Sequence, residues 1–261
     1  MRISEFPNPK LNLPKELRDL EDESRRKSFD AIQNYIKMVE PYIYTNIDLD
    51  NDPSDPIHIR AWVLKLISAS VLRSLYIRNS LVDAFNSRNI VGFFLPLKAW
   101  FEVVGFLASI LHLLESGLTP EEVFEKLKPY ALGNKGKGSL RVGTIDTKSV
   151  ADMLEKADKY MKKMIKEDGG DSAKNYFTDF YDIASNPSHP SFDAHELVGG
   201  LKDGGIWCAS HPNDFRRELI EWLPGYGGLL MAPLFVQNIC KKIFEIENDY
   251  FTEVKCSKYF D

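Results

Sequence analysis

Side chains suited to proton transfer are concentrated in one short segment, YDIASNPSHPSFDAHE. An imidazole titrates closest to neutral pH, so His189 is the candidate general acid or base of this segment. A structural role is the alternative, in which His189 lies beyond the end of a helix and hydrogen-bonds the free carbonyl groups there. The polar residues of the segment are Tyr181, Ser185, His189, Asp193, His195 and Glu196.

The same region contains enough potential ligands to suggest a metal site. The candidate metal ligands are His189, His195 and His211, with Glu196 and Cys208 nearby. The spacing of the first two histidines matches no regular zinc motif such as H-E-x-x-H. We therefore favour no metal at these residues and predict no cofactor. Nothing in the neighbouring sequence would activate Cys208 as a nucleophile.

A second polar pattern runs along the apolar segment Ile90–Leu114 and just beyond it. Its members are three or four positions apart, so they share one face of a helix. One interpretation is a solvent-facing seam, or a close helix contact through Gly105 and Ser109. The other is a polar cleft in which Glu102, like Tyr181, is a candidate catalytic residue. The pattern consists of Lys98, Glu102, Gly105, Ser109, His112 and Ser116.

The segment GNKGKGSLRVGTIDTK combines four glycines with basic side chains. Glycine-rich backbone with lysine is the composition of many phosphate-binding loops. The glycines at 133 and 138 have the spacing of a nucleotide-binding P-loop, but Ser139 and Leu140 stand where that motif needs Lys and Ser or Thr. We expect instead an exposed basic loop that contacts an anionic partner. Its candidate anion-binding residues are Lys135, Lys137 and Arg141.

Apolar residues at helical spacing predict the elements that position these side chains. Pro41 ends or kinks the first helix, and Pro233 is tolerated in the last only as a kink. Thr119 and Glu122 form a capping box that begins a short helix. The Asp-, Asn- and Pro-rich residues 45–56 form a loop. Helices are expected over residues 15–40, 57–88, 90–114, 119–127, 149–167, 172–185, 213–223 and 227–251.

Two short apolar runs, ELVGGL and IWCAS, flank the turn sequence KDGG. This pattern predicts a small β-hairpin near residues 197–210, with Asp203 and Gly204 in its turn. No repeat or change of composition divides the chain. The sequence therefore predicts one mainly all-α domain over residues 1–261, a multi-helix bundle with long antiparallel helices, which includes an exposed N-terminal arm over residues 1–13.

Composition and charge limit the classes of partner. The chain has 261 residues and a formal net charge of -5, which argues against binding nucleic acid through bulk charge. The segment Ile90–Leu114 is long enough to cross a bilayer, but Lys98 and Glu102 near its middle would each cost roughly 2.5 to 3.5 kcal/mol there. We expect no membrane segment and a cytoplasmic protein. Three widely spaced cysteines without a C-x-x-C pair fit reduced thiols.

Three segments resemble those of a family of uncharacterised bacterial all-helical proteins: FFLPLKAWFEVV, SLRVGTIDTKSVADMLEKADKY and FYDIASNPSHPSF. The most specific part is Tyr181 and Ser185 followed by His189 and Pro190. That family is similar in outline to HEPN-like helical proteins, some of which are ribonucleases of phage-defence and toxin systems. The resemblance implies a helical bundle with His189 in a cleft.

The chain also departs from the nuclease pattern. That pattern has an arginine a few residues before its histidine, where this chain has Asp182, Ile183 and Ala184. Without a guanidinium to stabilise phosphate charge, RNA cleavage is disfavoured. The leading hypothesis is therefore a binding or interaction domain that recognises a protein or small molecule, with a homodimer formed through the apolar helices. The alternative is a HEPN-like hydrolase or ribonuclease of a defence or toxin system, with His189 as acid or base.

Overall fold

The computed structural model describes residues 6–12, 23–47, 59–132, 147–171, 175–186, 199–202, 206–209, 231–245 and 256–258, and most of them are helical. The α-helix that ends at Val39 is followed by a short 3-10 helix, η2 (Glu40–Tyr42), which contains Pro41. The predicted mainly all-α bundle is therefore confirmed. The α-helices of the described residues are α2 (Glu23–Val39), α3 (Ile59–Asn86), α4 (Ile90–Leu114), α5 (Pro120–Leu132), α6 (Thr147–Glu167), α7 (Tyr176–Ser185) and α10 (Met231–Glu245).

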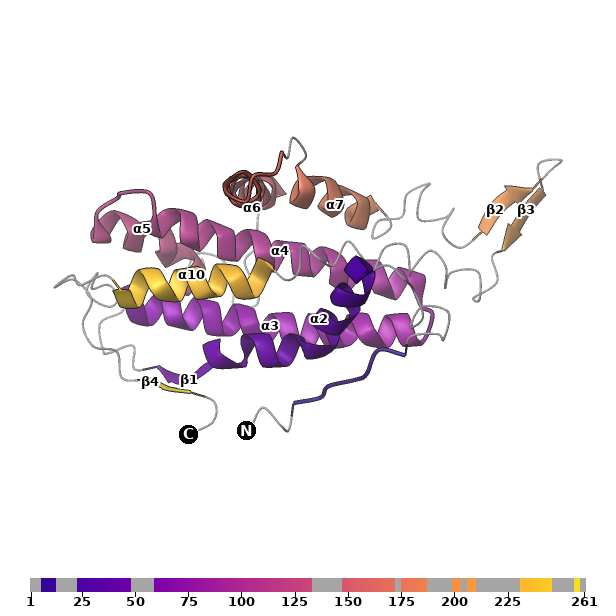
Figure 1. The fold of residues 1–261 in the computed structure, drawn as a ribbon, viewed down its shortest axis with the longest axis horizontal. Coiled ribbons are helices and arrows are strands. Elements are labelled where there is room, and N and C mark those ends of the chain that lie inside the picture. The colour runs from indigo at the N-terminus through magenta and orange to yellow at the C-terminus, as the bar shows by residue number, and fades with distance from the viewer. Residues whose placement is uncertain are drawn as a thin grey trace.

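The two longest helices, α3 and α4, form an antiparallel pair at the centre of the bundle (Figure 1). The chain reverses between them through Arg88, whose φ of 57° is a left-handed conformation that usually favours glycine. Asn89 then caps α4, because its side-chain oxygen accepts a hydrogen bond from the Gly92 N–H at 2.8 Å. Both the predicted pair and its cap are confirmed.

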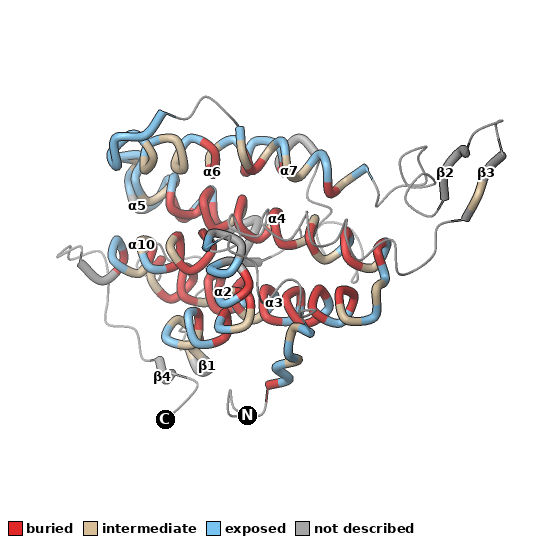
Figure 2. The backbone as a smooth tube through the Cα atoms, turned by 45° about the vertical axis from the view of Figure 1, so that its right-hand side comes forward, coloured by how far each residue is buried: buried red, intermediate tan, exposed pale blue. Residues whose placement is uncertain are grey.

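α4 is the core helix, with α3, α6, α7 and α10 packed against it. Figure 2 shows the buried residues gathered along the facing sides of α3 and α4. Trp100 is fully buried and meets the Tyr35 ring of α2 edge-on at a centroid distance of 5.0 Å. By length and composition α4 is the one described helix able to cross a bilayer, and 61% of its most apolar window is buried inside the protein. Packing within the bundle therefore accounts for the apolar residues of α4.

The starts of two further helices follow local sequence signals. The Glu122 N–H donates to Thr119 Oγ1 at 3.3 Å, and the Thr119 N–H donates to Glu122 Oε2 at 2.9 Å, so the predicted capping box is confirmed. The observed range of α10 begins at Met231. Pro233 lies near the start of this range, and the residues before Met231 that bear on the predicted kink lie outside the described residues. The helix predicted over 213–223 lies outside the described residues.

Two short antiparallel strand pairs complete the described structure. β2 (Gly199–Lys202) pairs with β3 (Ile206–Ala209), as the predicted hairpin requires, while its predicted turn lies outside the described residues. β1 (Tyr44–Ile47) pairs with β4 (Cys256–Lys258). The prediction of a loop from residue 45 is therefore wrong for residues 45–47. These residues form a strand because they pair with a segment more than two hundred residues away. Local turn propensity does not reveal such a partner.

The N-terminal residues are bound to the bundle. Phe6 is only 5% exposed, and its ring meets Tyr76 of α3 at a centroid distance of 4.8 Å. The Asn79 amide donates to the Pro7 carbonyl at 2.6 Å, and the Asn86 amide donates to the backbone carbonyl of residue 10 at 2.8 Å. Residues 6–12 are thus attached to α3 by the buried Phe6 ring and by two amides, while Pro7, Asn8, Lys10 and Asn12 remain exposed.

Candidate functional site

The main polar constellation of the described residues joins three helices around one carboxylate. Glu102 of α4 pairs with Arg73 of α3, with 3.3 Å between Oε2 and Nη2. The Tyr181 hydroxyl of α7 hydrogen-bonds to the same carboxylate. Lys98, one turn before Glu102, places Nζ 5.6 Å from the centroid of the Tyr181 ring. We call Arg73, Lys98, Glu102 and Tyr181 the Glu102 cluster.

The position of α7 depends on a buried acid of α6. Asp158 is only 3% exposed. Its Oδ1 accepts from the Phe177 N–H at 2.6 Å, and its Oδ2 accepts from the Thr178 N–H at 3.1 Å and from Thr178 Oγ1 at 2.7 Å. The carboxylate thus satisfies free N–H groups at the start of α7 and complements the positive end of the helix dipole. This contact fixes the first turn of the helix that carries Tyr181.

The surroundings of Tyr181 keep its hydroxyl protonated at neutral pH. Burial is the largest cause that raises the pKa of Tyr181, to about 12, and the charges of Glu102 and Asp182 add to it. The hydrogen bond to Glu102 acts in the same direction, because only the protonated phenol can donate it. At neutral pH Tyr181 therefore orients the Glu102 carboxylate and does not serve as a base.

The structure brings two of the three candidate catalytic residues together. Glu102 and Tyr181, which are far apart in the sequence, lie close enough for the carboxylate to raise the pKa of the phenol. The third candidate, His189, lies outside the described residues, four positions after the last residue of α7. The other candidate metal ligands and the basic loop also lie outside them: His195, His211, Lys135, Lys137 and Arg141.

The predicted polar stripe of α4 divides into parts with different surroundings. Gly105 is a close helix contact, since a Cβ there would lie 3.2 Å from Leu154 Cδ2 and 3.3 Å from the Leu154 backbone nitrogen of α6. Ser109 is buried and lines a pocket. His112 and Ser116 are exposed. The stripe is thus neither one continuous seam nor one continuous cleft.

Sequence reasoning did not find Arg73 or Asp158. Arg73 is a charged residue on the outward side of a long helix, which is a common solvated position. Asp158 is one of several acids in a highly charged helix. Neither has a local motif that marks it, and only the packing of α3 on α4 and of α7 on α6 gives them partners.

Among the described residues no group of three or more His, Cys, Asp or Glu side chains could hold a metal ion. Cys208 and Cys240 are both half-buried. Within the described part of the chain, the site therefore consists of charged and phenolic groups that bind one another.

Exposed apolar side chains lie next to the Glu102 cluster. Val91 and Leu95 of α4 are 39% and 52% exposed, and they continue toward the N-terminus the helix face that carries Lys98 and Glu102. Tyr76, one turn from Arg73 on α3, is 59% exposed. We call Arg73, Tyr76, Val91, Leu95, Lys98 and Glu102 the α4 face.

Comparison with known proteins gives no match: no protein-family model, no curated protein and no solved structure is significantly similar to this chain. The fold and the geometry of its side chains therefore carry the functional argument.

Proposed function

We propose that this chain is a cytoplasmic helical interaction domain that forms a homodimer through the α4 face. The observation that carries the proposal is the exposure of Val91 and Leu95, one turn apart on the helix that otherwise forms the core. Most of the apolar surface of α3 and α4 is already buried within one copy. A dimer therefore has to use the apolar residues that remain exposed.

The composition of the α4 face suits a protein contact. Tyrosine and arginine are enriched where interface residues contribute most to binding, and Tyr76 and Arg73 lie one turn apart here. Leu95 and Val91 supply an apolar centre, and the charged side chains supply a polar rim. This is the usual division of a protein–protein interface.

A second copy of the chain is the partner that the charges favour. A two-fold interface uses the same patch on both copies, with one residue of the patch against a different residue of the partner's patch, so a self-complementary face must carry both signs of charge. Arg73 and Lys98 of the α4 face are cationic, while Glu102 is anionic, and the exposed Asp182 of α7 lies beside the face next to Tyr181. Such a face can pair with itself without placing like charges together.

Sedimentation velocity over a range of concentrations tests the dimer. We expect a species of twice the 29.8 kDa chain mass and its loss in Leu95→Arg, which puts a charge at the apolar centre. Met38→Arg on α2 is the matched control, because Met38 is a 38% exposed apolar residue outside the α4 face. A monomer at every concentration, or equal loss of the dimer in both variants, would contradict the proposal.

A HEPN-like ribonuclease of a defence or toxin system is the second candidate, and one contact favours it. The local sequence before His189 lacks the arginine of the nuclease pattern, but Arg73 brings a guanidinium to Glu102 from a different helix. A guanidinium suits the charge that develops on a phosphate during cleavage. In the sequence His189 follows the last residue of α7 by four positions.

Incubation of the protein with labelled single-stranded RNA tests this second candidate. If His189 is the acid or base, His189→Ala abolishes cleavage, and Arg73→Gln lowers the rate by roughly 10²-fold or more, as loss of a charge-stabilising donor does. Lys65→Gln is the control for loss of a positive charge on the same helix. Cleavage that persists in His189→Ala, or no cleavage by the unaltered chain, would remove the ribonuclease hypothesis.

A further inference from the structure

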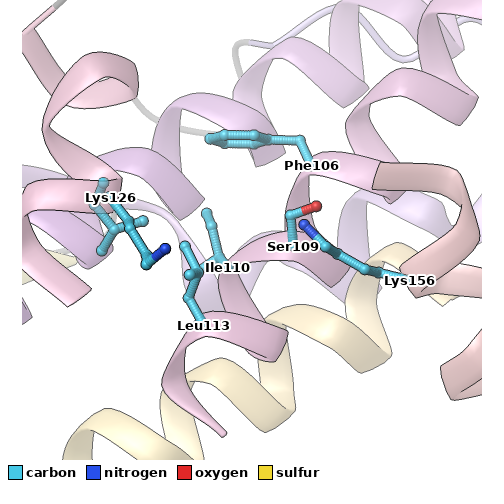
Figure 3. A pocket seen from close by; sticks show the side chains of 7 residues that line it. Phe106, Ser109, Ile110, Leu113, Lys126 and Lys156 are labelled. Atoms are coloured by element: carbon cyan, nitrogen blue, oxygen red, sulfur yellow. The ribbon is translucent and has the colours of Figure 1, made fainter. Parts of the chain in front are cut away.

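A second site lies further along α4, in a pocket between α4, α5 and α6 (Figure 3). Its cavity volume is about 220 Å³. Four apolar side chains form most of its wall, while two lysines enter it from different helices. The lining residues are Phe106, Ser109, Ile110, Leu113, Lys126, Leu127 and Lys156.

The pocket concentrates positive charge. Lys126 comes from α5 and Lys156 from α6, so two cations that are distant in the sequence line one cavity. Neither ammonium group is paired with a carboxylate among the described residues, whereas Lys159 of α6 forms an ion pair with Glu155 at 3.0 Å. An organic anion is the ligand charge that such a pocket favours.

A buried hydroxyl adds a specific polar group to the pocket. Ser109 is only 6% exposed, and its Oγ has no hydrogen-bond partner within the described part of the chain. A serine in a helix commonly satisfies its hydroxyl on a preceding backbone carbonyl, as Ser70 does with Leu66 at 2.8 Å. Ser109 does not, and Figure 3 shows the Lys156 nitrogen on the same side of the pocket as the Ser109 oxygen.

We propose that this pocket binds a small amphipathic anion, with its carboxylate or phosphate head between Lys126, Lys156 and the Ser109 hydroxyl, and its apolar body against the wall. The head would supply the acceptor that Ser109 lacks and the charge that offsets the two lysines. The apolar body would replace water on Phe106 and Leu113, which are only partly buried.

The size of the pocket limits the ligand. A cavity of about 220 Å³ holds several water molecules, because one water needs only roughly 10–15 Å³ of such space. A single aromatic ring with one anionic group therefore has room in it. The site is also separate from the Glu102 cluster, since Ser109 is two helical turns beyond Glu102, a rise of roughly 10 Å.

Binding is tested by fluorine NMR titration of the full chain with three probes: 4-fluorobenzoate, 4-fluorophenyl phosphate and the neutral 4-fluorobenzamide. We expect binding of at least one of the two anions, and the tighter of them identifies the head group. The amide has the shape of the benzoate but no charge, so we expect it to bind at least roughly tenfold more weakly.

Variants place the bound anion in the pocket. Lys156→Gln should raise its Kd roughly tenfold, and Ser109→Ala roughly fivefold, because each removes a hydrogen bond to the charged head. Lys126→Gln should raise Kd roughly threefold, since this lysine is more exposed. Lys159→Gln, on the same helix as Lys156, is the matched control and should leave Kd unchanged.

Each other outcome overturns the proposal. Equal binding of the amide and the anions would show that charge is not recognised. An equal change of Kd in Lys159→Gln and Lys156→Gln would place the anion outside the pocket. Absence of binding of both anions at millimolar concentration, with the circular dichroism of a folded helical protein, would show that the pocket is not a site for this class. None of these results depends on dimer formation or on RNA cleavage.

Discussion

Tyr181 donates a hydrogen bond to Glu102 from a half-buried position, and this makes its ionisation the most direct test of the site geometry. Its pKa is raised to about 12, from 10 for a free tyrosine. A phenol whose pKa is higher in the folded than in the unfolded protein stabilises the fold below pH 10. That contribution is lost as the pH rises from about 10 to about 12.

Glu102→Gln should therefore lower the pKa of Tyr181, but not to 10, because burial remains the largest cause of the shift. The measurement is a tyrosine absorbance titration, with Tyr181→Phe subtracted to isolate this residue from the other ten. Glu121→Gln is the control, since Glu121 is exposed and does not contribute to the Tyr181 shift. A Tyr181 pKa that is identical in the parent protein and Glu102→Gln would show that the two groups are not in contact.

Arg78 is a fully buried cation of α3. Its Nε donates to the Ile32 carbonyl at 3.1 Å and its Nη1 donates to Asn79 Oδ1 at 3.0 Å, while Nη2 has no partner in the described residues. Burial lowers the pKa of Arg78 to about 10, so it remains charged at neutral pH. Its contacts join α2, α3 and, through Asn79, the N-terminal residues.

Arg78→Ala should lower the free energy of unfolding by about 3 kcal/mol, because it leaves a cavity and removes the donors of two buried acceptors. Urea unfolding followed by circular dichroism measures this change. Arg73→Ala on the same helix is the control and should cost at most about 1 kcal/mol, since its side chain is 50% exposed. Equal losses in the two variants would show that Arg78 is not buried.

At the scale of elements, the attachment of α7 to α6 decides whether the Glu102 cluster forms. α7 has only ten residues and so depends on tertiary contacts for its stability. Asp158 supplies the polar contact at its start, and Phe177 supplies the apolar one, since it is fully buried and contacts the ring of Phe101. Loss of the acid would release the end of α7 that leads to Tyr181.

Asp158→Ala should therefore lower the free energy of unfolding by about 2 to 4 kcal/mol and also shift the pKa of Tyr181 down toward 10. Thermal unfolding and the tyrosine titration measure the two effects. Asp152→Ala, an exposed acid on the same helix, should change neither. A loss of stability with an unchanged Tyr181 pKa would mean that Asp158 does not position α7 for the cluster.

At the scale of the whole molecule, contacts between distant parts of the chain hold the ends against the helical core. The N-terminal residues bind α3 through Asn79 and Asn86, and they bind α2 where the Leu11 N–H donates to Gln33 Oε1 at 2.9 Å. Near the C-terminal end of the chain, β4 pairs with β1, the strand that follows α2 and η2. The N-terminal contact depends most on one buried ring, that of Phe6.

Phe6→Ala should lower the free energy of unfolding by about 2 to 4 kcal/mol through loss of apolar burial. Hydrogen exchange should become faster at Leu11 and Asn12, whose N–H groups are hydrogen-bonded to α2 and α3, with little change in α6. Asn8→Ala is the control, because Asn8 is exposed. Unaltered stability and exchange in Phe6→Ala would show that the arm is not bound in solution.

Much of the helical architecture is determined by the sequence itself. Apolar spacing over α3, α4 and α6, the Asn89 cap and the Thr119–Glu122 capping box are interactions between residues a few positions apart, so their patterns are visible in the chain. The hairpin of β2 and β3 belongs to the same class, because its strands are neighbours in sequence. The candidate residues Glu102 and Tyr181 were found from residue type, but nothing in the sequence related one to the other.

Tertiary structure alone decided which of these side chains meet. Arg73 reaches Glu102 only because α3 packs antiparallel on α4, and Tyr181 reaches it only because Asp158 anchors α7 on α6. The pairing of β1 with β4 likewise joins segments from near opposite ends of the chain. Such contacts depend on the packing of whole helices and strands. Local propensity does not predict that packing, because the same charged residue on a helix surface is equally compatible with solvent or with a partner.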